Sequence, residues 1–291
     1  MFVAAAIALT AAQQLPVEQN VHIRYNAGQD VVPVYEGWER AADGSFNMVF
    51  GYLNRNHVQE LSIAVGPQNG FEPGPADRGQ PTYFYTRENH FLFRVNVPKD
   101  WDRKKELVWT VGANGKTNTA RATLLDIWEI DRKLEVANNG GGVQVSNELI
   151  FKDQPPTITL GAPPRATAGT AVELTASVTD DGIPPERKPR PPRLTEPSLR
   201  ASGPPSPVNV PLPTKPRAPQ SLSVIWMIWR GPGGATFDPG GYVKVADGKA
   251  AVKATFSKPG TYVLRAFAHD GLLRTPADVT VNVDGSKPTP Q

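Results

Sequence analysis

The chain has 291 residues, no cysteine and a formal net charge of +3. This length gives room for about two domains, and the lack of cysteine excludes disulfide bridges, a thiol nucleophile and a cysteine-ligated metal. The positive charge is concentrated in residues 184–219, which hold seven Lys or Arg, two Glu and no aromatic residue. A nucleic-acid-binding face would place basic residues on folded elements with aromatic residues among them, so we expect no nucleic-acid partner.

Residues 1–12 predict a signal peptide. The apolar run at 2–12 has the length of a signal-peptide core and is too short to span a membrane, and small residues precede a cleavage point near Gln13. No Lys or Arg precedes the run, so the alternative is a frayed or buried N-terminal segment. No later stretch is long and apolar enough to span a bilayer. We therefore expect a protein exported to the periplasm or the cell exterior, without a membrane span.

Short alternating strands separated by Gly, Pro, Asn and Asp fill the first half of the chain. The alternation is clear at 45–53 and 90–97. Asn114 and Gly115 lie between two further strand-like runs, and because both residues tolerate positive φ they predict a β-hairpin. Strands at this spacing are typical of a β-sandwich or barrel. We predict an all-β fold, with an N-terminal β-sandwich over 17–131 that we assign to no family.

Residues 132–154 separate this domain from the next. Gly and Asn at 138–142 indicate a flexible linker, and the alternative is a terminal strand of the first domain. Two consecutive prolines follow Gln154 and make a stiff, extended joint. We therefore place a second domain over 155–284, followed by a short tail.

The second half repeats the strand pattern more clearly. Residues 222–229 are apolar on both faces, as a central strand should be. Its predicted strands cover 157–160, 171–178, 222–229, 250–256, 260–271 and 278–283.

The run GTYVLRAFAHDG at 260–271 resembles the penultimate strand of immunoglobulin-like domains of the polycystic-kidney-disease (PKD) type, which are common in secreted bacterial proteins. Tyr262 and Leu264 are similar to the tyrosine corner, with Leu264 where antibody domains have their second cysteine. The resemblance implies that Trp226 or Trp229 is the core tryptophan of the third strand. It also implies a non-enzymatic role in binding, adhesion or scaffolding.

The chain departs from the PKD pattern by a long insertion between the second and third strands. Residues 184–219 contain thirteen prolines, a composition that predicts an extended or disordered segment. PRPPR at 189–193 and PLPTKP at 211–216 have the spacing of polyproline II ligands. A solvated loop without a ligand is the alternative.

Three aspartates predict a calcium site at one tip of the second domain. Asp180 and Asp181 follow the second strand and Asp270 follows the sixth, and in this topology both loops lie at the same end. Carboxylate oxygens at a loop tip suit Ca²⁺. The alternative is that each aspartate shapes its own turn by bonding nearby backbone. We expect no other cofactor.

Aromatic residues of the first half suggest a sugar-binding face. Trp38, Tyr83, Tyr85 and Trp101 have flat rings of the kind that stack on sugars. Ordinary core and rim packing of a β-sandwich is the alternative, and it is the interpretation that the residue types favour. No zinc-protease or nucleophile-elbow motif occurs in the sequence.

The sequence therefore predicts an exported, non-enzymatic binding, adhesion or scaffold protein with a protein or polysaccharide partner in the cell envelope. One alternative is a carbohydrate-binding accessory protein for polysaccharide breakdown. The other is an enzyme whose site lies in the N-terminal domain.

Overall fold

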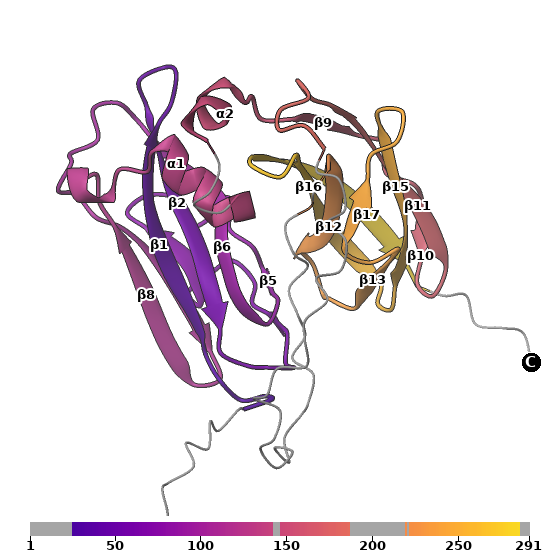
Figure 1. Ribbon diagram of the computed structural model, residues 1–291. Coiled ribbons are helices and arrows are strands. Elements are labelled where there is room, and N and C mark those ends of the chain that lie inside the picture. The colour runs from indigo at the N-terminus through magenta and orange to yellow at the C-terminus, as the bar shows by residue number, and fades with distance from the viewer. Residues whose placement is uncertain (1–24, 142–145, 187–218, 220, 286–291) are drawn as a thin grey trace, which may run out of the picture.

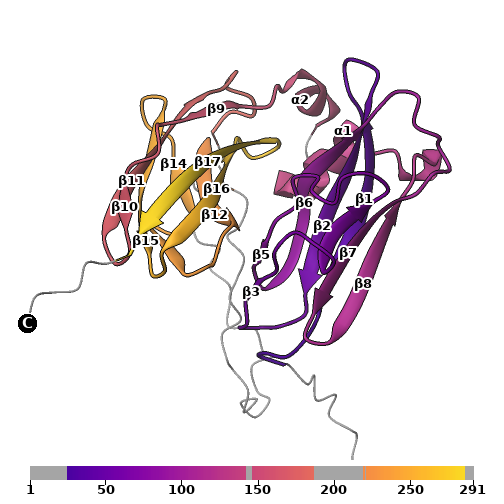
Figure 2. The ribbon, with the colours of Figure 1, turned by 180° about the vertical axis from the view of Figure 1, so that it is seen from behind.

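Strands dominate the computed structural model, which describes residues 25–141, 146–186, 219 and 221–285 (Figure 1). They form two β-sandwiches that lie side by side, with a few short helices near one end of the pair (Figures 1 and 2). The predicted all-β class is confirmed. The described helices are too short to cross a membrane, and the predicted signal peptide at 1–12 lies outside the described residues.

The first sandwich contains two three-stranded sheets, ordered β1-β2-β6 and β4-β7-β8, and a two-stranded pair, β3-β5. Its core is aromatic, with the rings of Phe93 and Trp109 in edge-to-face contact at 5.1 Å, a geometry that aromatic pairs favour. The strands are β1 (Val31–Arg40), β2 (Phe46–Asn54), β3 (Leu61–Ser62), β4 (Asn69–Glu72), β5 (Tyr83–Phe84), β6 (Arg87–Val97), β7 (Leu107–Ala113) and β8 (Lys116–Ala122).

Two local features of this sandwich test the sequence patterns. The predicted hairpin joins β7 to β8, and Asn114 and Gly115 have φ values of 50° and 78°, as a two-residue turn requires. Strand β1 was not predicted from the sequence, because Pro33 interrupts its pattern of alternating apolar and polar residues. It lies at the edge of its sheet, where proline is tolerated. Gly37 in β1 has φ 135°, and a Cβ there would lie 2.5 Å from the Trp128 carbonyl oxygen.

The second sandwich is immunoglobulin-like. Five strands in the order β10-β17-β16-β12-β14 face four in the order β13-β15-β11-β9. The tyrosine corner predicted at Tyr262 is present, since its hydroxyl lies 3.0 Å from the Lys258 carbonyl oxygen and 2.8 Å from that of Gly233. The strands are β9 (Thr157–Leu160), β10 (Ala166–Thr167), β11 (Ala171–Thr179), β12 (Ser223–Arg230), β13 (Ala235–Asp238), β14 (Tyr242–Lys244), β15 (Lys249–Phe256), β16 (Gly260–His269) and β17 (Arg274–Asp284).

The proline-rich run falls inside this second sandwich. It separates β11 from β12, which belong to different sheets of the same sandwich. The predicted insertion between the second and third strands is therefore confirmed. Its expected extended or disordered state concerns residues that lie, for the most part, outside the described ranges.

Helices replace the terminal strand that was considered for residues 132–154. The described part of this range holds α1 (Arg132–Val136), the π-helical turn η2 (Ala137–Gly141) and α2 (Asn147–Lys152), and the 3-10 turn η1 (Asp126–Trp128) precedes it. The Asp131 side chain accepts a hydrogen bond from the Leu134 amide at 2.8 Å, and Ser146 caps α2 in the same way. These two N-cap residues were the sequence signals for the helices. The exact domain limits stay a prediction.

One face of the five-stranded sheet packs against the first sandwich. Trp226 lies in the core of its own sandwich, whereas Trp229 is 1% exposed and joins the core of the first, together with Phe267. The Trp229 indole N–H donates to the Gly79 carbonyl oxygen at 3.0 Å, and the Arg265 guanidinium lies 3.6 Å from the indole centroid. Strand β12 is thus apolar on both faces because each face covers a different core.

Polar contacts surround this interface. Arg230 makes a two-pronged ion pair with Asp77 at 2.6 and 2.8 Å and donates to the Gln80 carbonyl oxygen at 2.9 Å. Hydrogen bonding from Arg230 is the main reason that the pKa of Asp77 falls to about 2. A second polar contact joins β17 to β6, where Arg274 donates to the carbonyl oxygens of residues 90 and 91 at 2.7 and 2.6 Å. The two sandwiches are therefore joined by apolar burial and by directional bonds.

The buried position of Trp229 in this interface leads us to expect a large loss of stability in the variant Trp229→Ala. Removal of the buried indole should lower the free energy of unfolding by about 3–5 kcal/mol and should split one calorimetric transition into two, because the sandwiches lose their shared core. Trp128→Ala makes the same chemical change at a side chain that is 46% exposed, and it should keep a single transition. Equal stability of the two variants would contradict the shared core.

Candidate functional site

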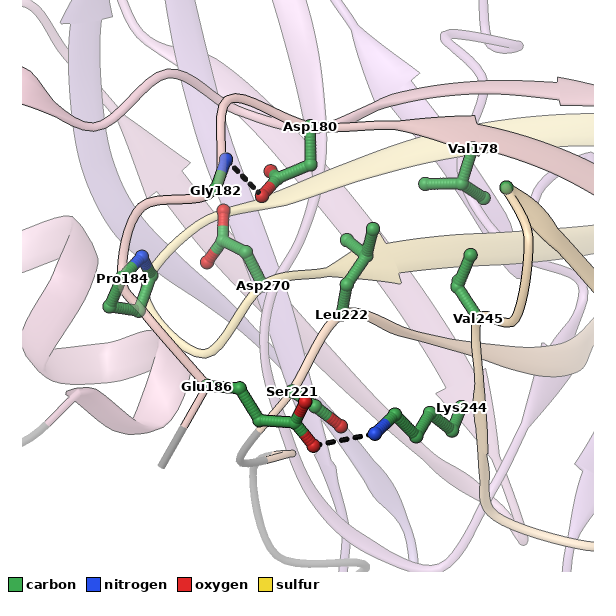
Figure 3. A pocket seen from close by; sticks show the side chains of 11 residues that line it. Val178, Asp180, Gly182, Pro184, Glu186, Ser221, Leu222, Lys244, Val245 and Asp270 are labelled. Atoms are coloured by element: carbon green, nitrogen blue, oxygen red, sulfur yellow. Dashed lines mark hydrogen bonds and ion pairs between the residues drawn. The ribbon is translucent and has the colours of Figure 1, made fainter. Parts of the chain in front are cut away.

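Acidic side chains gather at one end of the second sandwich. Asp180 follows β11 and Asp270 follows β16, and both line a pocket of about 400 Å³ (Figure 3). Figure 3 shows their carboxylates on the same side of this pocket, with the Lys244–Glu186 ion pair of 2.5 Å further along it. The structure thus brings together residues from the two loops that the topology placed at one tip.

A fourth aspartate, Asp153, belongs to the same cluster and was missed from the sequence. It follows α2, its residue is 0% exposed, and neither of its carboxylate oxygens has a hydrogen-bond partner. Its backbone is fixed, since its carbonyl oxygen accepts a bond of 2.5 Å from Arg132 and its amide donates to Leu149 at 3.0 Å. The sequence around Asp153 gave no signal that this residue belongs to the cluster, because its position depends on how α2 packs against the second sandwich.

Turn formation explains only some of the carboxylate oxygens. Asp181 accepts from the amides of Gln154 at 3.0 Å and Ile183 at 2.8 Å, so both of its oxygens are used. Asp180 Oδ2 accepts from the Gly182 amide, and Asp270 Oδ1 accepts from two amides of its own turn. The remaining oxygens, Asp180 Oδ1 and Asp270 Oδ2, are buried and have no partner.

Burial dominates the electrostatics of the cluster. It raises the pKa of Asp153 to about 7, with the charges of Asp270 and Asp181 adding to the shift and Arg132 opposing it. Burial likewise raises the pKa of Asp270 to about 6 and that of Asp180 above its ordinary value. The site therefore disfavours the ionised form of each of these carboxyls.

His269 lies beside the cluster as a neutral residue. Burial lowers its pKa to about 4. Its Nε2 donates to the Asn139 carbonyl oxygen at 2.9 Å, which leaves Nδ1 to accept from the Gly271 amide at 2.9 Å. Nε2 therefore fixes η2 against the tip, while Nδ1 supports the turn after β16. Within the described ranges, no three His, Cys, Asp or Glu side chains converge closely enough to hold a metal ion in this conformation.

The four candidate sugar-stacking rings do not share an open face. Trp38 is fully buried and donates to the Leu125 carbonyl oxygen at 2.9 Å. Tyr83 is 8% exposed and bonds Glu60, and the Tyr85 hydroxyl accepts from the Ile228 amide at 2.8 Å at the junction of the sandwiches. Trp101 is half-buried and packs against the first core. These placements correct the expectation for Trp38 and Tyr83, because a buried ring offers no face to a sugar.

No known protein-family description matches this chain, and no curated protein does. Among solved structures it is similar to fibronectin(III)-like modules of CbhA from Clostridium thermocellum, with 11% identity over 90% of this chain and 97% of that one and a TM-score of 0.26. It is also similar to a conjugative transposon lipoprotein from Bacteroides eggerthii, with 11% identity over 44% and 98% and a TM-score of 0.27.

A third similar structure is the surface layer protein SbsC, domains 1-6, with 10% identity over 89% of this chain and 28% of that one and a TM-score of 0.27. TM-scores this low do not support an inference about function. The immunoglobulin-like fold rests instead on the strand order and the tyrosine corner of the chain itself.

The two oxygens of Asp270 predict opposite effects for two substitutions in metal-free buffer. Asp270→Ala leaves two buried amides without an acceptor and should lower the free energy of unfolding by about 1–3 kcal/mol. Asp270→Asn keeps an acceptor and removes a buried charge, so it should be at least as stable as the wild type. Asp100→Ala, at an exposed position, should change little. Chemical denaturation measures all three, and equal losses in both Asp270 variants would refute the assignment.

Proposed function

We propose that this chain is an exported, non-enzymatic binding or scaffold protein of the bacterial envelope or exterior, with a second sandwich of the PKD type. The observation that carries the proposal is the buried interface at Trp229. It joins two sandwiches into one unit with a fixed relative orientation. Such a unit holds surfaces at its two ends at a constant separation, as a scaffold or spacer requires.

Sequence features agree with this role. The apolar run at 2–12 favours export. The basic, proline-rich insertion leaves and re-enters the sandwich beside the acidic pocket, between Glu186 and Ser221. This end of the second sandwich is our candidate for contact with an envelope partner.

The alternatives have less support. The carbohydrate-binding hypothesis depended on aromatic rings of the first sandwich, and Trp38 and Tyr83 are committed to the interior. For the enzyme hypothesis, no arrangement in the described residues supplies a favouring observation.

Export is tested with the full chain carrying a C-terminal tag in a Gram-negative host. We expect the product in the periplasm or medium, with a new N-terminus near Gln13 by mass spectrometry. Leu9→Arg places a charge in the apolar run and should trap the uncleaved chain in the cytoplasm. Leu15→Arg, the same change outside the run, should be exported normally. An uncleaved cytoplasmic wild-type chain would overturn the export part of the proposal.

The binding role is tested by cosedimentation of the purified product with total cell envelopes and, separately, with cellulose. We expect sedimentation with envelopes alone. Sedimentation with cellulose but not with envelopes would contradict the scaffold role and favour the carbohydrate-binding alternative.

A further inference from the structure

We propose that Asp153, Asp180 and Asp270 form a binding site for a hard divalent cation, Ca²⁺, at the end of the second sandwich beside α2. The three carboxylates come from three separate segments, namely the residue after α2, the loop after β11 and the loop after β16.

Four unpaired oxygens point to a ligand. Both oxygens of Asp153, Oδ1 of Asp180 and Oδ2 of Asp270 are buried without a hydrogen-bond partner. In the part of the chain that the structure describes, no other carboxylate oxygen is in this condition. Buried carboxylates normally find a donor or a metal, because an unpaired buried charge is costly. Carboxylate oxygens supplied by several loops are the ligands that Ca²⁺ binds in proteins.

Charge balance points the same way. With Asp181, the cluster holds four acidic groups, and Arg132 is the cation that opposes the charge of Asp153. The Arg132 guanidinium donates to the backbone oxygens of residues 153 and 150, so it does not pair with the carboxylate. A divalent ion would offset the negative charge of the cluster, which Arg132 does not pair with directly.

The donor set selects Ca²⁺ among common ions. All the free groups are oxygens, whereas Zn²⁺ favours nitrogen and sulfur ligands. Ca²⁺ accepts six to eight oxygens in flexible geometry and completes its shell with carbonyl groups and water, while Mg²⁺ demands a near-ideal octahedron. The carboxylates do not converge in this conformation, so the proposal requires side-chain rotation when the ion binds. Asp180 and Asp270 already line a pocket at this end of the sandwich.

Asp181 has a positioning role in this site. Its oxygens already bond the amides of Gln154 and Ile183, and the first of these bonds holds the residue next to Asp153 against the tip. The sequence pattern had assigned Asp181 as a ligand and had omitted Asp153. The ion would fasten α2 to two tip loops, and so would stiffen the link between the sandwiches.

The test measures thermal unfolding and calorimetric binding of the full chain at pH 7.5, with CaCl₂ after removal of metal by EDTA. Wild type should bind one Ca²⁺, and at about 100 times the dissociation constant its Tm should rise by about 5 °C or more. Asp153→Asn keeps size and removes charge, so it should fold and lose both the heat of binding and the Tm shift. Asp100→Asn is the matched control at an exposed site and should keep both.

Two outcomes would overturn the site. One is a wild-type chain without a Ca²⁺-dependent heat or Tm shift. The other is an Asp153→Asn variant that retains them. MgCl₂ and NaCl at matched ionic strength separate binding from screening, and a shift of equal size in NaCl would also refute the site.

Discussion

Strands β12 and β16, at the centre of the five-stranded sheet of the second sandwich, contribute side chains to cores on both faces of the sheet. One face covers its own core through Trp226, and the other carries Trp229 into the core of the first sandwich. An immunoglobulin-like sheet usually exposes its outer face to water. Here the part of that face formed by β12 and β16 packs against the neighbouring sandwich, and this contact fixes the relative orientation of the two. The short helices between them are held in turn, by Arg132 and by the bond from His269 to Asn139.

This arrangement has a cost at the end of the second sandwich. When α2 docks beside the tip, it buries Asp153 next to Asp180 and Asp270, and burial raises the pKa of each of these carboxyls. Stability would be higher with neutral groups at these positions. This electrostatic cost is the reason that we treat the cluster as the candidate site.

Local patterns predicted local structure well. Alternation predicted most of the longer strands, Asn114-Gly115 predicted the hairpin, and Tyr262 predicted a tyrosine corner. These succeeded because each depends on residues close together in the chain or on one conserved geometry of a strand end. The failures involved residues whose partners are remote. Trp38 was predicted as a candidate sugar-binding ring, but it is buried in a core. Residues 132–154 contain short helices, for which the N-cap residues Asp131 and Ser146 were the local sequence signals.

Residue patterns were enough to predict the fold class, the insertion between β11 and β12, and the proximity of Asp180 and Asp270 at one tip, because strand order in a sandwich dictates which loops are neighbours. The folded arrangement was needed to learn that Trp226 and Trp229 belong to different cores, and that Asp153 joins the cluster while both Asp181 oxygens bond backbone amides. Those choices depend on how two sandwiches and a short helix pack against one another. Packing of remote surfaces leaves no periodic trace in the sequence.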